Sequence, residues 1–151
     1  MNERIVQMLT RLAIDNPGVQ NRCKLAAGVV FRKNLIATGV NGYKTHPMMM
    51  PEYGYREGQM YLHAEPDAIK NALRLVSQDQ LARCDLYVIR VKRPYTGAKT
   101  WIQGIAKPCA GCMKTITLYG IKNVYWTTDE DDTYRTQEQV NLWISELKPG
   151  L

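Results

Sequence analysis

Two short segments of the chain hold residues that could bind a metal ion and move a proton. The first contains His63 and Glu65, and the second contains Cys109 and Cys112, which are spaced Cys-x-x-Cys. Zinc in proteins takes imidazole nitrogen and thiolate sulfur in a tetrahedral arrangement, and a catalytic zinc site leaves one position open for water. Because His63, Cys109 and Cys112 supply three such ligands, we predict a catalytic zinc (Zn2+) site.

Prolines near both segments indicate that the ligands lie at the starts of helices. Pro66 is tolerated only in the first turn of a helix, which places His63 at a helix N-terminus. Pro108 opens a second helix, over residues 109–119, in the same way. A helix N-terminus carries partial positive charge, which lowers the pKa of a thiol. We therefore expect both cysteines of the second segment to be thiolates that balance the charge of zinc.

Glu65 lies two residues after His63, so its carboxylate can face the metal site without binding the metal. A carboxylate in that place can take a proton from water and pass it to a leaving amine. Alone, Cys-x-x-Cys is as often a redox pair or two packed thiols, and a lone His-x-Glu is usually unrelated to catalysis. The presence of both at predicted helix starts favours hydrolytic removal of an amino group.

The remaining sequence predicts the elements that hold these segments in place. Apolar residues at helical spacing predict helices over residues 3–14, 64–76, 109–119 and 136–147. Short apolar runs predict strands over residues 25–32, 35–41, 85–91 and 123–127. Strands that alternate with helices imply an α/β layer fold.

Three connections bear on the fold and the site. Lys33-Asn34 separates the first two strands, which predicts a β-hairpin with Asn34 in its turn. Residues 42–62 are expected to form a loop, and residues 92–107 a loop or a hairpin. Because long loops inside a compact domain are usually functional, we expect these two segments to recognise the substrate.

Bulk properties limit the class of protein. A length of 151 residues and an apolar fraction of 45% predict one globular domain over residues 1–151. No apolar run approaches the ~18 residues of a membrane span, and no signal peptide is evident, so we expect no membrane partner and a cytoplasmic location. A reducing cytosol favours metal binding over disulfides. The net charge of +6 fits a nucleotide or nucleic-acid partner, and equally a basic solvated surface.

The two segments together resemble the signature of the zinc-dependent cytidine and deoxycytidylate deaminase superfamily, His-x-Glu followed by Pro-Cys-x-x-Cys. The resemblance runs from about Ala26 to Thr127. It implies a three-layer α/β/α fold with a mixed sheet, in which zinc lies between two helix starts and Glu65 shuttles protons during deamination of a cytosine ring. It also implies that Asn41 contacts the substrate sugar, that the backbone around Ala64 contacts the pyrimidine, and that the protein forms a homo-oligomer.

Among the branches, the sequence is most similar to the deoxycytidylate deaminases, whose first ligand is His rather than a third Cys. This similarity favours dCMP as the substrate and dUMP and ammonia as the products. The alternatives are a polynucleotide deaminase acting on tRNA or single-stranded DNA, and a nucleoside deaminase acting on cytidine or deoxycytidine. A zinc-stabilised binding module is the alternative outside enzymes, but Glu65 and a ligand set of three rather than four argue against it.

Basic residues of the two predicted loops are candidate contacts for a 5′-phosphate or a polynucleotide backbone. We select Lys44, Lys92 and Arg93 as substrate-binding residues. Arg56, Lys99 and Lys107 belong to the same group, and for each member a solvated surface position is the simpler explanation. Aromatic residues of these loops, among them Trp101, could stack on a base.

Overall fold

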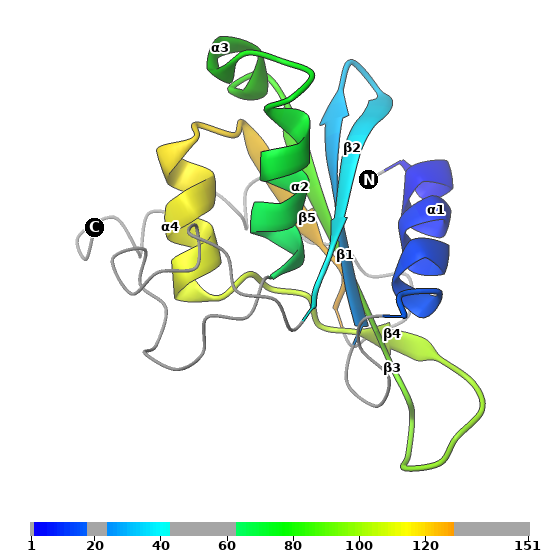
Figure 1. Cartoon of the computed structure of the whole chain (residues 1–151). Helices are drawn as coiled ribbons and strands as arrows, with labels where there is room; N and C mark the ends of the chain where they lie inside the picture. Colours follow the sequence, from blue (N-terminus) through cyan, green and yellow to red (C-terminus); the bar gives the residue numbers. More distant parts are fainter. Residues whose placement is uncertain (1, 18–23, 43–62, 129–151) are drawn as a thin grey trace.

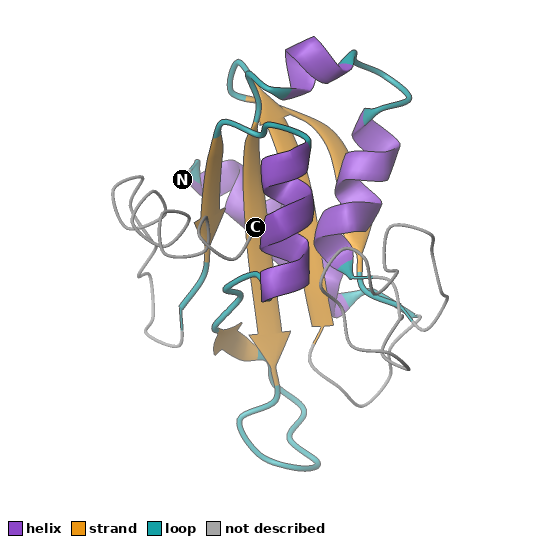
Figure 2. Cartoon of the chain, turned by 90° about the vertical axis from the view of Figure 1, so that its left-hand side faces the viewer, coloured by secondary structure: helices purple, strands orange, loops and turns teal. Residues whose placement is uncertain are grey.

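The computed structural model of the chain describes residues 2–17, 24–42 and 63–128. Its helices and strands form three layers (Figure 1). The helix α1 (Glu3–Ile14) covers one face of a sheet, and α2 (Ala64–Ala72) and α4 (Ala110–Leu118) cover the other, while the short α3 (Gln78–Leu81) follows α2. Figure 2 shows α2 and α4 side by side over the strands, with α1 behind them. This arrangement confirms the predicted α/β/α fold.

The sheet is mixed, as predicted. Its strands are β1 (Lys24–Phe31), β2 (Asn34–Val40), β3 (Asp85–Lys92), β4 (Ile102–Gly104) and β5 (Asn123–Trp126). β1 pairs antiparallel with β2 on one side and with β3 on the other. The far edge of β3 is shared, because its first half pairs parallel with β5 and its last three residues pair antiparallel with β4.

Burial on both faces of the sheet explains why β3 reads as an almost continuous apolar run. Leu86 and Val88 belong to the core under α2 and α4, whereas Tyr87 and Ile89 belong to the core under α1. The apolar stripe of α1 packs on that second core. None of the helices in the described part of the chain is long and apolar enough to cross a membrane.

The hairpin between β1 and β2 forms as predicted, but its turn lies one residue earlier. Arg32 and Lys33 have φ values of 50° and 67°, which is the backbone of a type I′ turn. Asn34 is instead the first residue of β2 and pairs with Phe31. The assignment of Asn34 to the turn was therefore wrong. The pairing of β1 with β2 also shifts register between Val29 and Val30.

The boundary that differs most from the prediction is the end of α2, whereas several others differ by one residue. α2 ends at Ala72 instead of residue 76, and Leu73 and Leu75 are exposed, so they add no packing that would extend the helix. The segment predicted as a loop or a hairpin is a hairpin, since β3 continues to Lys92 and returns as β4. The predicted loop 42–62 and the predicted helix 136–147 lie outside the described residues.

Gly39 sets how closely α2 approaches β2. A Cβ atom at Gly39 would lie 2.2 Å from the backbone nitrogen of Ala68 and 2.6 Å from the carbonyl oxygen of Ala64. Backbone atoms in a packed helix cannot move aside cheaply, so we expect Gly39→Ala to lower the free energy of unfolding by about 3 kcal/mol. Urea denaturation of the purified variant measures this change.

Gly42→Ala is the matched control for this prediction. Within the described part of the chain, a Cβ atom at Gly42 would meet no atom within 4 Å. This variant should therefore unfold at a urea concentration close to that of the unaltered protein. Equal midpoints for Gly39→Ala and Gly42→Ala would contradict the close packing of α2 on β2.

Candidate metal centre

The metal-ligand candidates lie at two helix N-termini, as the prolines predicted. His63 is the N-cap residue of α2, and Cys109 is the N-cap residue of α4. Cys112 lies in the first turn of α4, and its backbone N–H donates to Cys109 Sγ at 3.5 Å. Both helices begin at the same end of the sheet (Figure 1). Two elements far apart in sequence therefore bring the three side chains together.

The three donor atoms lie close enough together to share one zinc ion. His63 Nδ1 lies 3.1 Å from Cys112 Sγ and 3.7 Å from Cys109 Sγ, and all three donors lie within 4.8 Å of one another. Tetrahedral zinc with ordinary Zn–S and Zn–N bonds holds its ligand atoms about 3.6 to 3.8 Å apart. One imidazole nitrogen and two sulfurs are also the donor types that zinc prefers. The residues present therefore fit zinc.

The side chains of this group perturb one another's ionisation. The hydrogen bond from the Cys112 side chain lowers the pKa of Cys109 to about 4, and His63 acts in the same direction against the opposing effect of burial. Burial acts to lower the pKa of His63, but the hydrogen bond with Cys109 and the charge of Glu65 raise it above its ordinary value. Cys109 is therefore a thiolate at neutral pH, as a zinc ligand must be.

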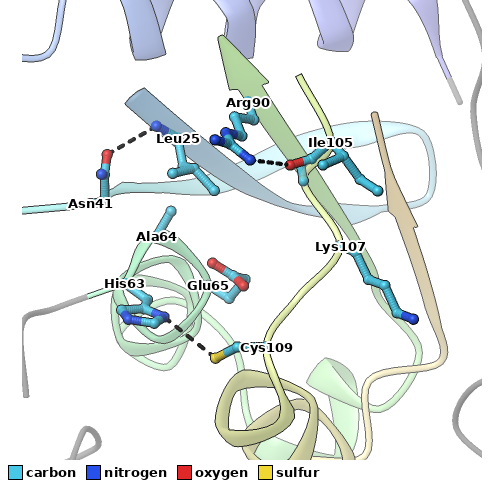
Figure 3. A pocket seen from close by; sticks show the side chains of 10 residues that line it. Leu25, Asn41, His63, Ala64, Glu65, Arg90, Ile105, Lys107 and Cys109 are labelled. Atoms are coloured by element: carbon cyan, nitrogen blue, oxygen red, sulfur yellow. Dashed lines mark hydrogen bonds between the residues drawn. The ribbon is translucent and has the colours of Figure 1, made fainter. Parts of the chain in front are cut away.

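Glu65 is in the second position of α2 and is 3% exposed. Burial raises the pKa of Glu65 above that of an ordinary carboxyl, although the positive charge of His63 lowers it. The net effect is a raised pKa. A group that both accepts and donates protons works best when its pKa lies near the pH at which the enzyme operates. Figure 3 shows the carboxylate directed into a cavity beside His63 and Cys109.

This cavity has a volume of about 320 Å³. One end of it is formed by His63, Cys109 and Glu65, and the other by residues of the sheet (Figure 3). The residues that line it are Leu25, Asn41, His63, Ala64, Glu65, Arg90, Ile105, Ala106, Lys107 and Cys109. Two predicted substrate contacts, Asn41 and Ala64, are therefore in the wall of the same cavity as Glu65.

Asn41 is held by residues from the opposite layer of the fold. Its Oδ1 accepts hydrogen bonds from the Leu25 N–H at 2.9 Å and from Asn16 Nδ2 at 3.4 Å. Asn16 Nδ2 also donates to the Asn41 carbonyl at 2.8 Å, and Lys24 Nζ donates to the Asn16 carbonyl at 2.9 Å. Asn16 and Lys24 are both buried, so the end of α1 fixes the orientation of Asn41 in the cavity.

Two of the other predicted substrate contacts, Lys92 and Arg93, are not in the cavity wall. Arg93 lies over the Trp101 ring, 4.5 Å from its centroid, and its Nη1 donates to the Ala98 carbonyl. Lys92 is at the end of β3, and neither Lys92 nor Arg93 lines the cavity. Lys44 lies outside the described residues. A role for these three residues in phosphate binding stays a prediction.

Two residues of the site were not singled out from the sequence. Arg90 lines the cavity from β3, and Asn16 supports Asn41. The sequence does mark Arg90, because it is the one charged residue within the otherwise apolar run 86–91. Charged side chains are rare in a strand that is buried on both faces, so this one indicates a specific role. No comparable signal marks Asn16, whose partner is 25 residues away.

Comparison with solved structures shows the same fold in two kinds of deaminase. The chain is similar to the apo dCMP deaminase of cyanophage S-TIM5, with a TM-score of 0.50 and 19% identity over 97% of this chain and 94% of that chain. The complex of that enzyme with dCMP and dUMP matches with a TM-score of 0.51 and 20% identity, over 83% and 82% of the two chains. The cytidine deaminase of Burkholderia pseudomallei matches with a TM-score of 0.58 and 16% identity, over 97% and 96%.

Comparison of the sequence with protein families gives a more specific result. No curated protein sequence matches the chain significantly. The family profile described as the cytidine and deoxycytidylate deaminase zinc-binding region, however, matches residues 1–128. That range includes both ligand segments and the whole sheet. The chain therefore belongs to the cytidine and deoxycytidylate deaminase family and carries the zinc-binding region that defines it.

Proposed function

We propose that the protein hydrolyses the amino group of a free cytosine nucleotide, converting dCMP to dUMP and ammonia. The observation that carries this proposal is the buried carboxyl of Glu65 in the same cavity as His63 and Cys109. His63, Cys109 and Cys112 would hold the zinc, which supplies a Lewis acid that makes water a stronger nucleophile at neutral pH. A structural zinc site has no use for an adjacent buried carboxyl.

The proton steps are assigned to Glu65. In the reaction, a water oxygen bonds to C4 of the ring as the C4=N3 double bond opens and N3 takes up a proton. The bond from C4 to the amino nitrogen then breaks, and ammonia leaves. Of the two protons of the water, one ends on N3 of the product and the other on ammonia. Glu65 accepts a proton from the water and donates it to the departing amino group, so its charge is restored at the end of each cycle. Its burial supports both steps, since burial raises the pKa of Glu65 and so makes this carboxyl easier to protonate than an exposed one.

The choice of a nucleotide over a nucleoside is supported by charge in the cavity wall. The fold alone does not discriminate, because a dCMP deaminase and a cytidine deaminase share it. Arg90 and Lys107, however, line the cavity together with the uncharged Asn41. Positive charge in the wall favours a substrate that carries a phosphate, above all at the half-buried Arg90, because opposite charges attract most strongly away from bulk water.

A polynucleotide substrate is supported less well. The hairpin of β3 and β4 carries basic residues, but its Trp101 ring lies 4.5 Å from the Arg93 guanidinium and 5.3 Å from Lys24 Nζ, measured to the ring centroid. A ring engaged by these cations is a poor platform for stacking a base. We therefore propose a small-molecule nucleotide as the partner of this site.

An ammonia-release assay with four substrates tests the proposal. The zinc-loaded protein is given dCMP, CMP, deoxycytidine and a cytosine-containing oligonucleotide at equal concentration. We expect kcat/KM to be highest for dCMP. Preference for the oligonucleotide would favour the polynucleotide alternative, and equal rates for dCMP and deoxycytidine would favour a nucleoside deaminase. Failure to release ammonia from all four would contradict cytosine deamination.

A further inference from the structure

We propose that Arg90 binds the 5′-phosphate of the substrate and thereby makes the site selective for nucleotides over nucleosides. This inference rests on the proposed function, since it assigns a partner to the charged end of that substrate. Arg90 is separated from the metal ligands in sequence and comes from β3 rather than from a helix start. Its side chain nevertheless lines the same cavity as Glu65.

The strand register places Arg90 in a row with Asn41. Leu25 of β1 is the pairing partner of Arg90 in β3, and on its other side the Leu25 carbonyl accepts the Asn41 N–H at 3.3 Å. Adjacent strands lie ~4.8 Å apart, so the backbones of Asn41 and Arg90 are separated by roughly 10 Å. Both side chains thus reach the cavity from the sheet, on the side away from Cys109 (Figure 3).

This row is where the phosphate of a bound nucleotide belongs. The amino group that leaves must be near Glu65, at the metal end of the cavity (Figure 3). In a mononucleotide the phosphate is at the opposite end of the molecule from that amino group, with the sugar between them. A nucleotide that presents its ring to Glu65 therefore extends toward Asn41 and Arg90.

The surrounding chain fixes the orientation of the Arg90 side chain. Its Nη1 donates to the Ile105 carbonyl at 3.1 Å, and its backbone N–H donates to Thr127 Oγ1 at 3.2 Å. Gly104 lies opposite Arg90 in the pairing of β3 with β4, and a Cβ atom at Gly104 would be 3.2 Å from Arg90 Cδ. Glycine at this position lets the aliphatic part of Arg90 lie against the β4 backbone.

The chemistry of a guanidinium suits this task. It carries five N–H donors in a planar fork, a geometry that matches two oxygens of a phosphate. The other lysine or arginine among the described lining residues is Lys107, which is exposed and lies two residues from Cys109, at the metal end. Position, partial burial and anchoring therefore favour Arg90 over Lys107 as the phosphate ligand.

Arg90→Gln in the zinc-loaded protein tests the inference. Hydrogen bonds between charged groups are among the strongest in proteins, so we expect kcat/KM for dCMP to fall about 100-fold. The value for deoxycytidine, which has no phosphate, should change less than about threefold. Arg90→Lys keeps the charge but loses the fork, and we expect an intermediate loss of about tenfold for dCMP.

Arg83→Gln is the matched control, since Arg83 is an exposed residue after α3 and the substitution removes the same charge. It should leave the ratio of dCMP to deoxycytidine activity unchanged. Equal losses for dCMP and deoxycytidine in Arg90→Gln would overturn the inference, because Arg90 would then act on the ring or sugar. If Arg90→Gln does not fold, as judged by circular dichroism, the ratio measured for Arg90→Lys decides in the same way.

Calorimetric binding separates this inference from the proposed reaction. Titration of the zinc-loaded protein with dUMP and with deoxyuridine needs no turnover, and we expect Arg90→Gln to weaken dUMP binding about 100-fold and deoxyuridine binding little. If the unaltered protein binds dUMP no more tightly than deoxyuridine, Arg90 is not a phosphate ligand, even where the deamination assay succeeds. If the deamination assay fails, selective dUMP binding would still support Arg90.

Discussion

Glu65→Gln is expected to reduce deamination by about 10³- to 10⁴-fold while the protein keeps its fold and its zinc. Glutamine has almost the same shape as glutamate, so it fits the buried position at the start of α2. It cannot accept and return a proton, and each catalytic cycle needs both steps. Ammonia release from dCMP measures the loss, and elemental analysis measures the zinc content.

Glu65→Asp separates the position of the carboxyl from its presence. Aspartate can carry a proton, but its side chain is shorter by one methylene group, so its carboxyl extends less far into the cavity. We therefore expect activity between that of Glu65→Gln and that of the unaltered protein. Turnover by Glu65→Gln at the unaltered rate would show that another group carries the protons. Loss of zinc in Glu65→Gln would instead make Glu65 part of the metal site.

Cys112→Ser is expected to remove the metal as well as the activity. Cys112 is fully buried, and its sulfur lies 3.1 Å from His63 Nδ1. A hydroxyl is a much poorer zinc ligand than a thiolate, so zinc per chain should fall from about one to a small fraction under mild chelation. Because the metal binds the folded state, thermal stability should fall with it. Elemental analysis and a melting curve measure the two effects.

Cys84→Ser provides the control for this variant. Cys84 is equally buried, but its sulfur donates to the Gln80 carbonyl at 3.3 Å, and it does not belong to the group that could hold a metal. This variant should keep its zinc and its response to chelators. Equal zinc loss in Cys84→Ser and Cys112→Ser would contradict the assignment of Cys112 as a ligand.

The metal-ligand candidates could be predicted from the sequence because local signals mark them. Pro66 and Pro108 fix where two helices begin, and the ligands are within a few residues of those prolines. Apolar patterns of the same local kind predicted an α/β layer fold, and the family resemblance implied its three layers. Predictions failed where a boundary depends on strand register rather than on residue types alone, as with the hairpin turn, which is closed by the pairing of Phe31 with Asn34.

The sheet end of the cavity was harder to predict because its contacts join segments that are distant in sequence. Arg90 is directed by Gly104 and Ile105, which reach it only because β4 folds back on β3. Asn16 reaches Asn41 from the end of α1. One domain over residues 1–151, a homo-oligomer and a cytoplasmic location stay predictions.

The distance along the chain between His63 and Cys109 has a consequence for how zinc acts on folding. Their side chains approach within 3.7 Å, although they are 46 residues apart in sequence. An unfolded chain that bound zinc through both would have to close this loop, at an entropic cost of about 4 kcal/mol at room temperature. The folded chain has already closed it, so zinc should bind the native state in preference. The melting temperature should accordingly rise with the concentration of free zinc.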